Sequence, residues 1–330
     1  MRQPPYPIVQ KPYGQALVDL ARRRREIVCL SGDLTRQCEV DEFQAVFPDR
    51  FIQCGMAEAN MIGVAGALAR SGLIPFVHTF GVFATRRPLD QIINAVAMPG
   101  LPVRIAGFMP GVSTPGGPSH QAIDDVALMR AIPGMTIIDV ADAAQASQVP
   151  AATADLPGPV YIRLKRGEIP VIYSDDHVLA LDRAEVLTDG ADVALFASGM
   201  MLAPALAAAG VLGGVTVVDV PVIKPLDAHT VTEVAARCRV VLTAENHSVI
   251  GGLGSAVAEV LAESGLGRPL RRIGLRDIFA EGALTWSYLF GKYGLSVQSI
   301  IDAAWDVLGR PGPAPQAPDV AAAEAEYAPV

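Results

Sequence analysis

The sequence has little cysteine and none of the short motifs that identify common enzyme classes on their own. Its 330 residues include four cysteines and no Cys-x-x-Cys pair, so neither a disulfide framework nor a zinc site is expected, and the thiols are predicted to be reduced and buried. No Walker A sequence, His-Glu-x-x-His motif or nucleophile elbow occurs. The glycine-rich residues 251–254 lack the Gly-x-Gly-x-x-Gly spacing and predict a tight turn before a helix rather than a dinucleotide site.

The chain also lacks an excess of positive charge and an unbroken apolar run. Lys and Arg total 26 against 34 Asp and Glu, a net charge of -8, so a nucleic-acid partner is not expected. The first residues contain no apolar signal core, and we expect a cytoplasmic protein. Residues 193–218 carry no charge and are long enough to span a bilayer, but Gly and Pro divide them, so a strand, a short helix, a turn and a strand fit better and no membrane association is expected.

Short apolar runs alternate with helix-like stretches along the whole chain, in a composition that is 51% hydrophobic and 18% charged. Strands are predicted at residues 27–30, 51–54, 74–77, 103–106, 136–138, 160–162, 193–197, 215–218, 240–243 and 271–275. The main helices of the first half are predicted at residues 14–25, 57–70, 86–96 and 123–130. This alternation predicts an α/β protein made of two doubly wound domains with mostly parallel sheets.

A charge-rich stretch at residues 168–192 interrupts the alternation, and we place the domain junction there. The predicted domains are therefore residues 1–180 and 181–310. Residues 311–330 are rich in Pro and Ala without periodicity, which predicts a mobile tail.

Polar clusters follow several predicted strands, at the sheet edge where open parallel sheets bind ligands. Two residues in these clusters are candidates for chemistry. Glu58 lies in the first turn of an apolar helix, where it could simply interact with the helix dipole, or could share a proton with a ligand nitrogen. His120 follows a Gly/Pro/Ser loop, and a structural histidine is the alternative to a catalytic one.

Taken together, the clusters resemble the transketolase family. Residues 55–63 (Gly-Met-Ala-Glu-Ala-Asn-Met-Ile-Gly) are similar to its G-x-A-E-x-N-M signature. Residues 117–121 (Gly-Pro-Ser-His-Gln) are similar to its G-P-[ST]-H-Q segment, and residues 31–35 (Ser-Gly-Asp-Leu-Thr) to its S-A-D-L-T segment. Residues 223–227 (Ile-Lys-Pro-Leu-Asp) and 292–295 (Lys-Tyr-Gly-Leu) resemble its last domain. The resemblance covers about residues 12–308.

The resemblance implies the pyrimidine-binding and C-terminal domains of a thiamine diphosphate enzyme. The family's Gly-Asp-Gly and Asn-Asn diphosphate motif is absent from the sequence. The chain therefore resembles the C-terminal subunit of a split transketolase, with a separately encoded diphosphate-binding N-terminal subunit as partner and an α2β2 assembly. Mg2+ or another divalent cation is expected on that partner, with no metal site here. The implied reaction transfers a two-carbon ketol unit from a ketose or 2-oxo acid donor to an aldehyde acceptor.

Site roles follow from the positions of residues in these motifs. The resemblance implies that Glu58 binds the pyrimidine N1′ atom and that His120 contacts substrate and moves a proton, which makes these two the catalytic candidates. The remaining candidates are implied to bind cofactor or substrate: Phe80 and Phe83 around the pyrimidine, Asp33 near the thiazolium side and Arg166 at a substrate phosphate.

Two positions depart from the sugar transketolases. Gly116 stands where many of them have Asp, and Phe108 where they often have His. We expect both changes to make the pocket less polar and to weaken the use of ordinary pentose and hexose phosphates. Three alternatives stay open: the beta subunit of a 2-oxo acid dehydrogenase, an enzyme similar to deoxyxylulose phosphate synthase, which residues 245–248 resemble, and a non-catalytic subunit.

Overall fold

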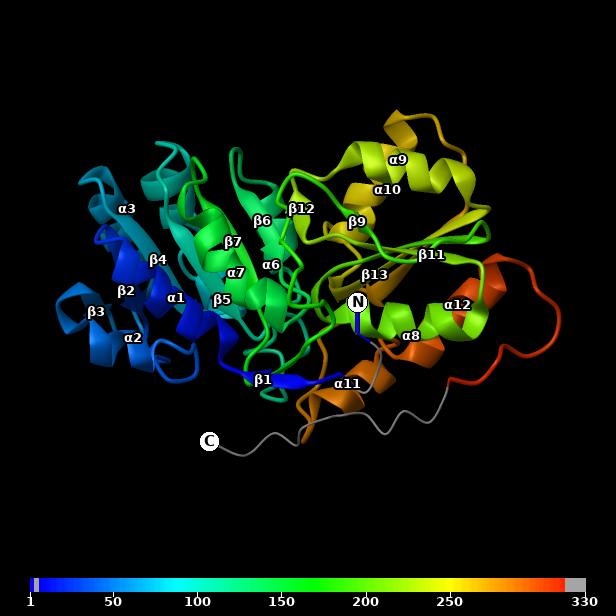
Figure 1. Cartoon of the computed structure of the whole chain (residues 1–330), viewed down its shortest axis with the longest axis horizontal. Coiled ribbons are helices and arrows are strands. Elements are labelled where there is room, and N and C mark those ends of the chain that lie inside the picture. The colour runs from blue at the N-terminus through cyan, green and yellow to red at the C-terminus, as the bar shows by residue number, and fades with distance from the viewer. Residues whose placement is uncertain (3–5, 318–330) are drawn as a thin grey trace.

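The fold is that of a computed structural model, which describes residues 1–2 and 6–317. Each half of the chain builds one twisted sheet with helices on both faces, and the two halves lie side by side (Figure 1). The first half runs from blue to green in that view, and the second half continues to red. The prediction of two α/β units with mostly parallel sheets is confirmed.

Seven strands form the first sheet. In spatial order they are β12 (Val222–Lys224), β6 (Thr136–Asp139), β7 (Val160–Leu164), β5 (Arg104–Phe108), β4 (Ile74–Phe80), β2 (Ile27–Ser31) and β3 (Phe51–Gln53). All neighbours pair in parallel except β12, which comes from the second half and runs antiparallel to β6. A small antiparallel pair, β1 (Ile8–Gln10) with β8 (Glu168–Pro170), lies outside this sheet.

Helices cover both faces of the first sheet because its strands are apolar on both sides. The first face carries α1 (Pro12–Arg23) and α7 (Ala143–Ala154), and the second carries α3 (Glu58–Arg70) and α6 (Asp125–Arg130). In β2, Ile27 and Cys29 pack toward α1, whereas Val28 and Leu30 pack toward α3. This period-two pattern is that of a strand buried on both faces.

Five strands form the second sheet. They are β14 (Leu270–Leu275), β13 (Val240–Ser248), β10 (Val193–Ala197), β11 (Val215–Asp219) and, antiparallel at the edge, β9 (Glu185–Val186). The helices α8 (Leu202–Leu212), α11 (Trp286–Lys292) and α12 (Val297–Val307) lie on one face, and α9 (Ala228–Arg237) and α10 (Leu253–Glu263) lie on the other.

Residues 193–218, which hold no charge, fold as β10, a short 3-10 turn η3 (Gly199–Met201), α8 and β11. This is the order that the sequence favoured over a membrane span. Over residues 1–2 and 6–317, no helix has the length and apolar character needed to cross a membrane.

The predicted helix at residues 86–96 differs from the structure. There the chain forms α4 (Gly81–Thr85) and α5 (Leu89–Gln91), followed by a π-helical turn η2 (Ile92–Ala97). Pro88 separates α4 from α5, because a proline supplies no backbone donor to a helix. The strand β4 is also longer than predicted, since it continues through His78 to Phe80.

Two short elements lie between the second and third strands of the chain. A helix α2 (Asp41–Val46) and a 3-10 turn η1 (Pro48–Arg50) connect β2 to β3.

At the C-terminal end, the predicted tail is described only to residue 317. Within that part, Gln298 of α12 donates to the carbonyl oxygen of Pro315 and accepts from the amide of Ala317, so this portion lies against α12. Residues 318–330 lie outside the described residues.

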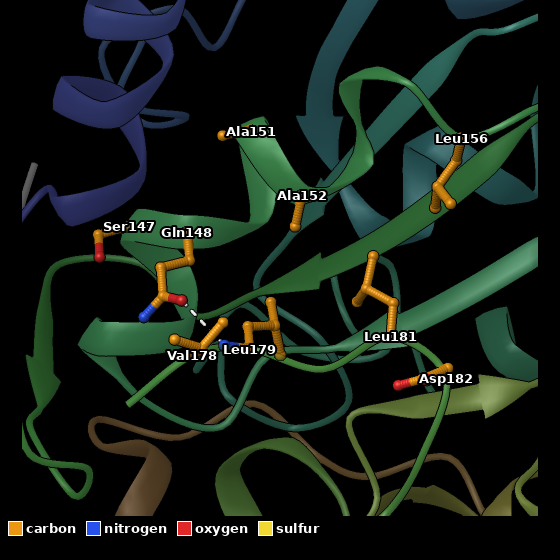
Figure 2. A pocket seen from close by; sticks show the side chains of 9 residues that line it. All are labelled: Ser147, Gln148, Ala151, Ala152, Leu156, Val178, Leu179, Leu181 and Asp182. Atoms are coloured by element: carbon orange, nitrogen blue, oxygen red, sulfur yellow. Dashed lines mark hydrogen bonds between the residues drawn. The ribbon is translucent and has the colours of Figure 1, made fainter. Parts of the chain in front are cut away.

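A shallow groove of about 660 Å³ runs between α7 and the segment that links the two halves (Figure 2). Its lining is mainly apolar and includes Ala152, Leu156, Leu179 and Leu181. Gln148 bridges the two sides, because its side chain donates to the carbonyl oxygen of residue 177 and accepts from the amide of Leu179. The groove therefore marks the place where the linking segment docks on α7.

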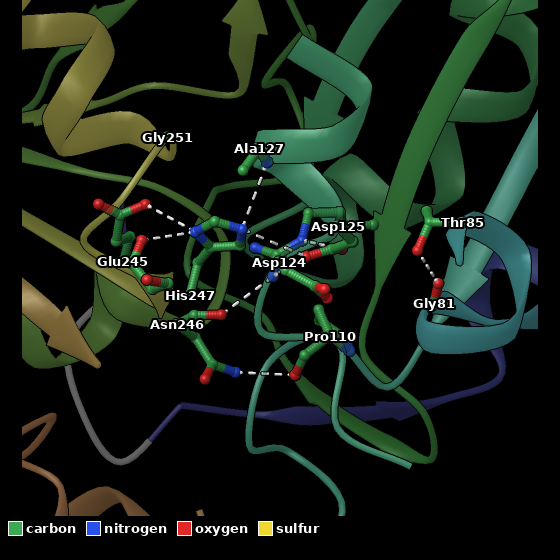
Figure 3. Close-up of polar contacts among 12 residues, drawn as sticks. Gly81, Thr85, Pro110, Asp124, Asp125, Ala127, Glu245, Asn246, His247 and Gly251 are labelled. Atoms are coloured by element: carbon green, nitrogen blue, oxygen red, sulfur yellow. Dashed lines mark hydrogen bonds and ion pairs between the residues drawn. The ribbon is translucent and has the colours of Figure 1, made fainter. Parts of the chain in front are cut away.

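Buried ionic contacts join the two halves. Arg163 of β7 donates to Asp125 and Asp139, and to the backbone oxygen of Asn246 on β13. Both of its ion pairs are almost fully buried, at 2.8 Å each. Although burial disfavours the charged carboxylate, Arg163 lowers the pKa of Asp125. Figure 3 shows the adjoining part of this junction, where His247 lies between Asp125 and Glu245.

A second buried carboxylate at the junction, Asp219 at the end of β11, has no cationic partner among its hydrogen bonds. Its Oδ2 atom accepts from Gln145 at 2.6 Å and from the Tyr173 hydroxyl at 2.8 Å, while Oδ1 makes no hydrogen bond within the described residues. Burial raises the pKa of Asp219 from 3.8 to about 7. The folded state therefore holds a proton between pH 4 and 7 that the unfolded state releases, and stability contributed by this group falls as the pH rises through that window.

Asp219→Asn should make the protein less sensitive to alkaline pH. The amide keeps an oxygen for both donors and cannot ionise. Urea unfolding of both proteins at pH 5 and pH 8 checks this: between these values the parent should lose about 3 kcal/mol more of its free energy of unfolding than the variant. Parallel pH profiles for the two proteins would contradict the assignment of a buried, proton-holding Asp219.

Candidate active site

The ends of β2, β3 and β4 meet at one edge of the first sheet. The amide of Gly32 donates to His78 of β4, and the amide of Cys54 donates to Ser31 of β2. Gly55 follows with a φ of 69°, a left-handed conformation that glycine adopts at little cost. This turn directs the chain from the sheet edge into α3, and Glu58 is the first residue of that helix.

Glu58 is buried, with 2% of its side chain exposed. Its Oε1 atom accepts from Nη1 of Arg87 at 2.7 Å, and the arginine side chain is 49% exposed. A carboxylate at a helix N-terminus is favoured by the helix dipole. Here it also meets a cation at the surface, so the carboxylate lies directly behind a solvent-accessible group.

Aromatic rings extend this arrangement toward His120. The guanidinium of Arg87 lies 4.1 Å from the centre of the Phe83 ring. Phe80 lies nearly parallel to Phe83 at 6.1 Å between ring centres, and the His120 ring meets Phe83 edge-on at 5.4 Å. The structure thus brings four predicted residues together with Arg87; we call these five residues the Glu58 cluster.

His120 sits on the loop between β5 and α6. Its backbone amide donates to Gly117, and its Nδ1 atom lies 2.9 Å from the Ser119 hydroxyl oxygen. Gly116 lies directly beside it, because a Cβ atom at that position would be 3.1 Å from the Cβ atom of His120. A side chain at residue 116 would therefore crowd the His120 side chain. The effect of Gly116 on substrate choice stays a prediction.

Asp33 and Arg166 both act electrostatically on the thiol of Cys38. Asp33 is exposed in the loop after β2, and Arg166 is half-buried after β7. Burial raises the pKa of Cys38, the positive charge of Arg166 opposes that rise, and Asp33 adds to it. Both loops follow strands of the first sheet at their carboxyl ends. These two candidates therefore lie at the predicted edge.

The structure places two residues in ways that the sequence does not show. Phe108 is fully buried in the core and meets the Tyr13 ring edge-on at 5.7 Å, and its expected effect on the use of sugar phosphates stays a prediction. Arg87 is a site residue that the motifs do not indicate. Its signal in the sequence is a pair of arginines, four residues beyond Phe83, at the start of a stretch that predicts an ordinary helix.

Comparison with protein families assigns both halves of the chain. Residues 8–171 match the family model described as "Transketolase, pyrimidine binding domain". Residues 182–300 match the one described as "Transketolase, C-terminal domain". Together these matches cover most of the chain.

Individual proteins give the same result. The chain is 43% identical over 303 residues to the 6-deoxy-6-sulfo-D-fructose transketolase subunit SqwH of Clostridium sp. (strain MSTE9), covering 90% of this chain and 94% of that protein. It is 32% identical over 307 residues to an apulose-4-phosphate transketolase subunit of Phocaeicola vulgatus, covering 91% of this chain and 97% of that protein.

A solved structure extends the similarity to three dimensions. It is described as "Split gene transketolase, inactive beta4 tetramer", is 42% identical in sequence and covers 91% of this chain and 97% of its own, with a TM-score of 0.84. The two matched domains, the polar edge that carries Glu58 and the extent of these similarities agree, and the chain belongs to the transketolase family.

Proposed function

We propose that this chain is the C-terminal subunit of a two-chain, thiamine diphosphate-dependent transketolase. In this proposal residues 1–180 bind the pyrimidine half of the cofactor and residues 181–310 form the C-terminal domain. The enzyme transfers a two-carbon ketol unit from a small ketose or 2-oxo acid donor to an aldehyde acceptor. The observation that carries the proposal is the buried carboxylate of Glu58, which is joined through Arg87 to the ring of Phe83.

The Glu58 cluster fits an aminopyrimidine. Such a ring needs a carboxylate for a ring nitrogen and an aromatic face for stacking, and Glu58 and Phe83 supply both. Phe80 supports Phe83 from the core. When bound, thiamine diphosphate supplies a carbon nucleophile that carries the two-carbon unit. Glu58 would hold a proton at the pyrimidine N1′ atom, and Arg87 would fix the direction of that carboxylate.

The remaining candidates act on other parts of the ligands. His120 contacts Phe83, so a group bound beside that ring can exchange a proton with the imidazole. Asp33 would face the thiazolium side of the cofactor. Arg166 would bind an anionic group of the substrate.

The proposal assigns the diphosphate and its Mg2+ or other divalent cation to a partner subunit. Over the described residues, no group of three or more His, Cys, Asp or Glu side chains could hold a metal ion. The related split-gene structure is described as an inactive tetramer of beta chains, which supports the need for a second kind of subunit. We propose an α2β2 assembly with a separately encoded diphosphate-binding chain.

The purified chain should not turn over substrate by itself. With thiamine diphosphate and Mg2+ present, a ketol-transfer assay should show activity only after the partner chain is added, because the proposed diphosphate site lies on that chain. The product of a neighbouring gene that encodes such a domain is the test partner. Turnover by this chain alone would overturn the two-subunit proposal.

Glu58→Gln should abolish turnover of the reconstituted complex while leaving assembly intact. The amide has nearly the same size, but it cannot share the N1′ proton, so the rate should fall by more than about a hundredfold. Deuterium exchange at the cofactor's thiazolium carbon measures the same step without substrate. The control is His120→Ala, which should slow substrate turnover and leave that exchange largely unchanged. Equal exchange by Glu58→Gln and the parent would show that Glu58 is only a helix-terminal carboxylate.

A further inference from the structure

The loop that carries His120 is supported by the second domain. In residues 109–121, the backbone oxygen of Pro115 accepts from the amide of Ala283 at 3.0 Å. The buried side chain of Gln121 donates to the backbone oxygen of Glu281 at 3.0 Å. These two bonds lie on either side of His120 in the sequence, and both end on one short segment of the other domain, residues 281–283.

The two backbones also lie close to each other at this contact. Gly117 has a φ of 78°, and a Cβ atom at that position would lie 3.7 Å from the Cα atom of Gly282, which is an ordinary van der Waals distance. Glycine is favoured at residue 117 by its left-handed conformation, which turns the loop back toward His120. The loop is thus held to the second domain by one backbone hydrogen bond, by the side chain of Gln121 and by this close approach.

Segment 281–283 is itself fixed by the end of α11. The amide of Glu281 donates to the hydroxyl oxygen of Tyr293 at 2.9 Å. The carboxylate of Glu281 accepts from Lys292 at 2.6 Å and from the Tyr288 hydroxyl at 2.9 Å. Lys292 lowers the pKa of Glu281, as does Tyr288 to a smaller degree. The segment is therefore anchored through both its backbone and its side chain.

We propose that Tyr293 and Lys292 are positioning residues for His120. They hold segment 281–283, which in turn holds the loop at Pro115 and Gln121. This gives a role to the Lys-Tyr-Gly-Leu stretch at residues 292–295 and makes the C-terminal domain a support for substrate binding. The effect on catalysis rests on the proposed function of His120, whereas the support itself does not.

Hydrogen exchange in the full chain tests the support directly. Tyr293→Phe removes one hydroxyl group, and a single lost hydrogen bond should raise amide exchange of a peptide covering residues 113–121 about fivefold. Lys292→Met should act in the same direction. Tyr6→Phe is the matched control, because it removes the same atom from another ring that packs on the second core. Exchange in β2 and β4 should stay as in the parent, which separates loosening of the loop from general unfolding.

The reconstituted complex tests the consequence for catalysis, with hydroxypyruvate as donor and glycolaldehyde as acceptor. Tyr293→Phe should raise KM for hydroxypyruvate about fivefold, with a smaller change in kcat and unchanged deuterium exchange at the cofactor. Unaltered exchange of residues 113–121 in Tyr293→Phe would overturn the support, and faster exchange with an unchanged KM would overturn its role in positioning His120. Failure of the proposed function would look different: the parent complex itself would turn over neither hydroxypyruvate nor a ketose donor.

Discussion

The buried guanidinium of Arg163 is the constraint on which the arrangement of the two domains depends. It binds Asp125 of α6 and Asp139 of β6 in its own domain, and the backbone of Asn246 in the other. Asp139 in turn accepts from Ser198 of the second domain. A charge removed from water needs all of these partners at once, and losing one of a buried pair costs about 3–5 kcal/mol. These contacts therefore favour the arrangement in which the two sheets meet.

Contacts at the junction between the two domains also hold the loop that carries His120. Asn246, which lies at the junction, donates to the backbone oxygen of Pro110 and accepts from the amide of Val112. These residues begin the loop that ends near His120. The same interface that buries Arg163 thus sets the start of the loop, and segment 281–283 sets its later part. Glu58 begins a helix that packs on the first sheet, whereas the loop that carries His120 is held by contacts with the second domain.

The sequence was most informative where local pattern decides structure. Both-face burial of runs such as residues 27–30 predicted parallel strands, and the position of Glu58 after a strand placed it at the binding edge. The pattern could not show that β12 would leave its own half and join the first sheet, because that pairing depends on the packing of the domains. The contact of Gln121 with Glu281 is similar, since it joins residues 160 positions apart.

Two side-chain placements could not be predicted from the sequence. The position of Phe108 in the motif does not show that its ring packs in the core against Tyr13. Arg87 was overlooked because nothing in its local sequence shows that it reaches Glu58, 29 residues earlier in the chain. In both cases the direction of one side chain decides its role, and that direction is set by neighbours that are distant in the sequence.

The central claim is that the cofactor site is complete only when two different chains meet. Calorimetric titration of thiamine diphosphate, in the presence of Mg2+, into this chain, into its partner and into their mixture tests it most directly. The account predicts saturable, stoichiometric binding by the mixture and at most weak binding by either chain alone. Binding by this chain alone with the affinity and stoichiometry of the mixture would contradict it.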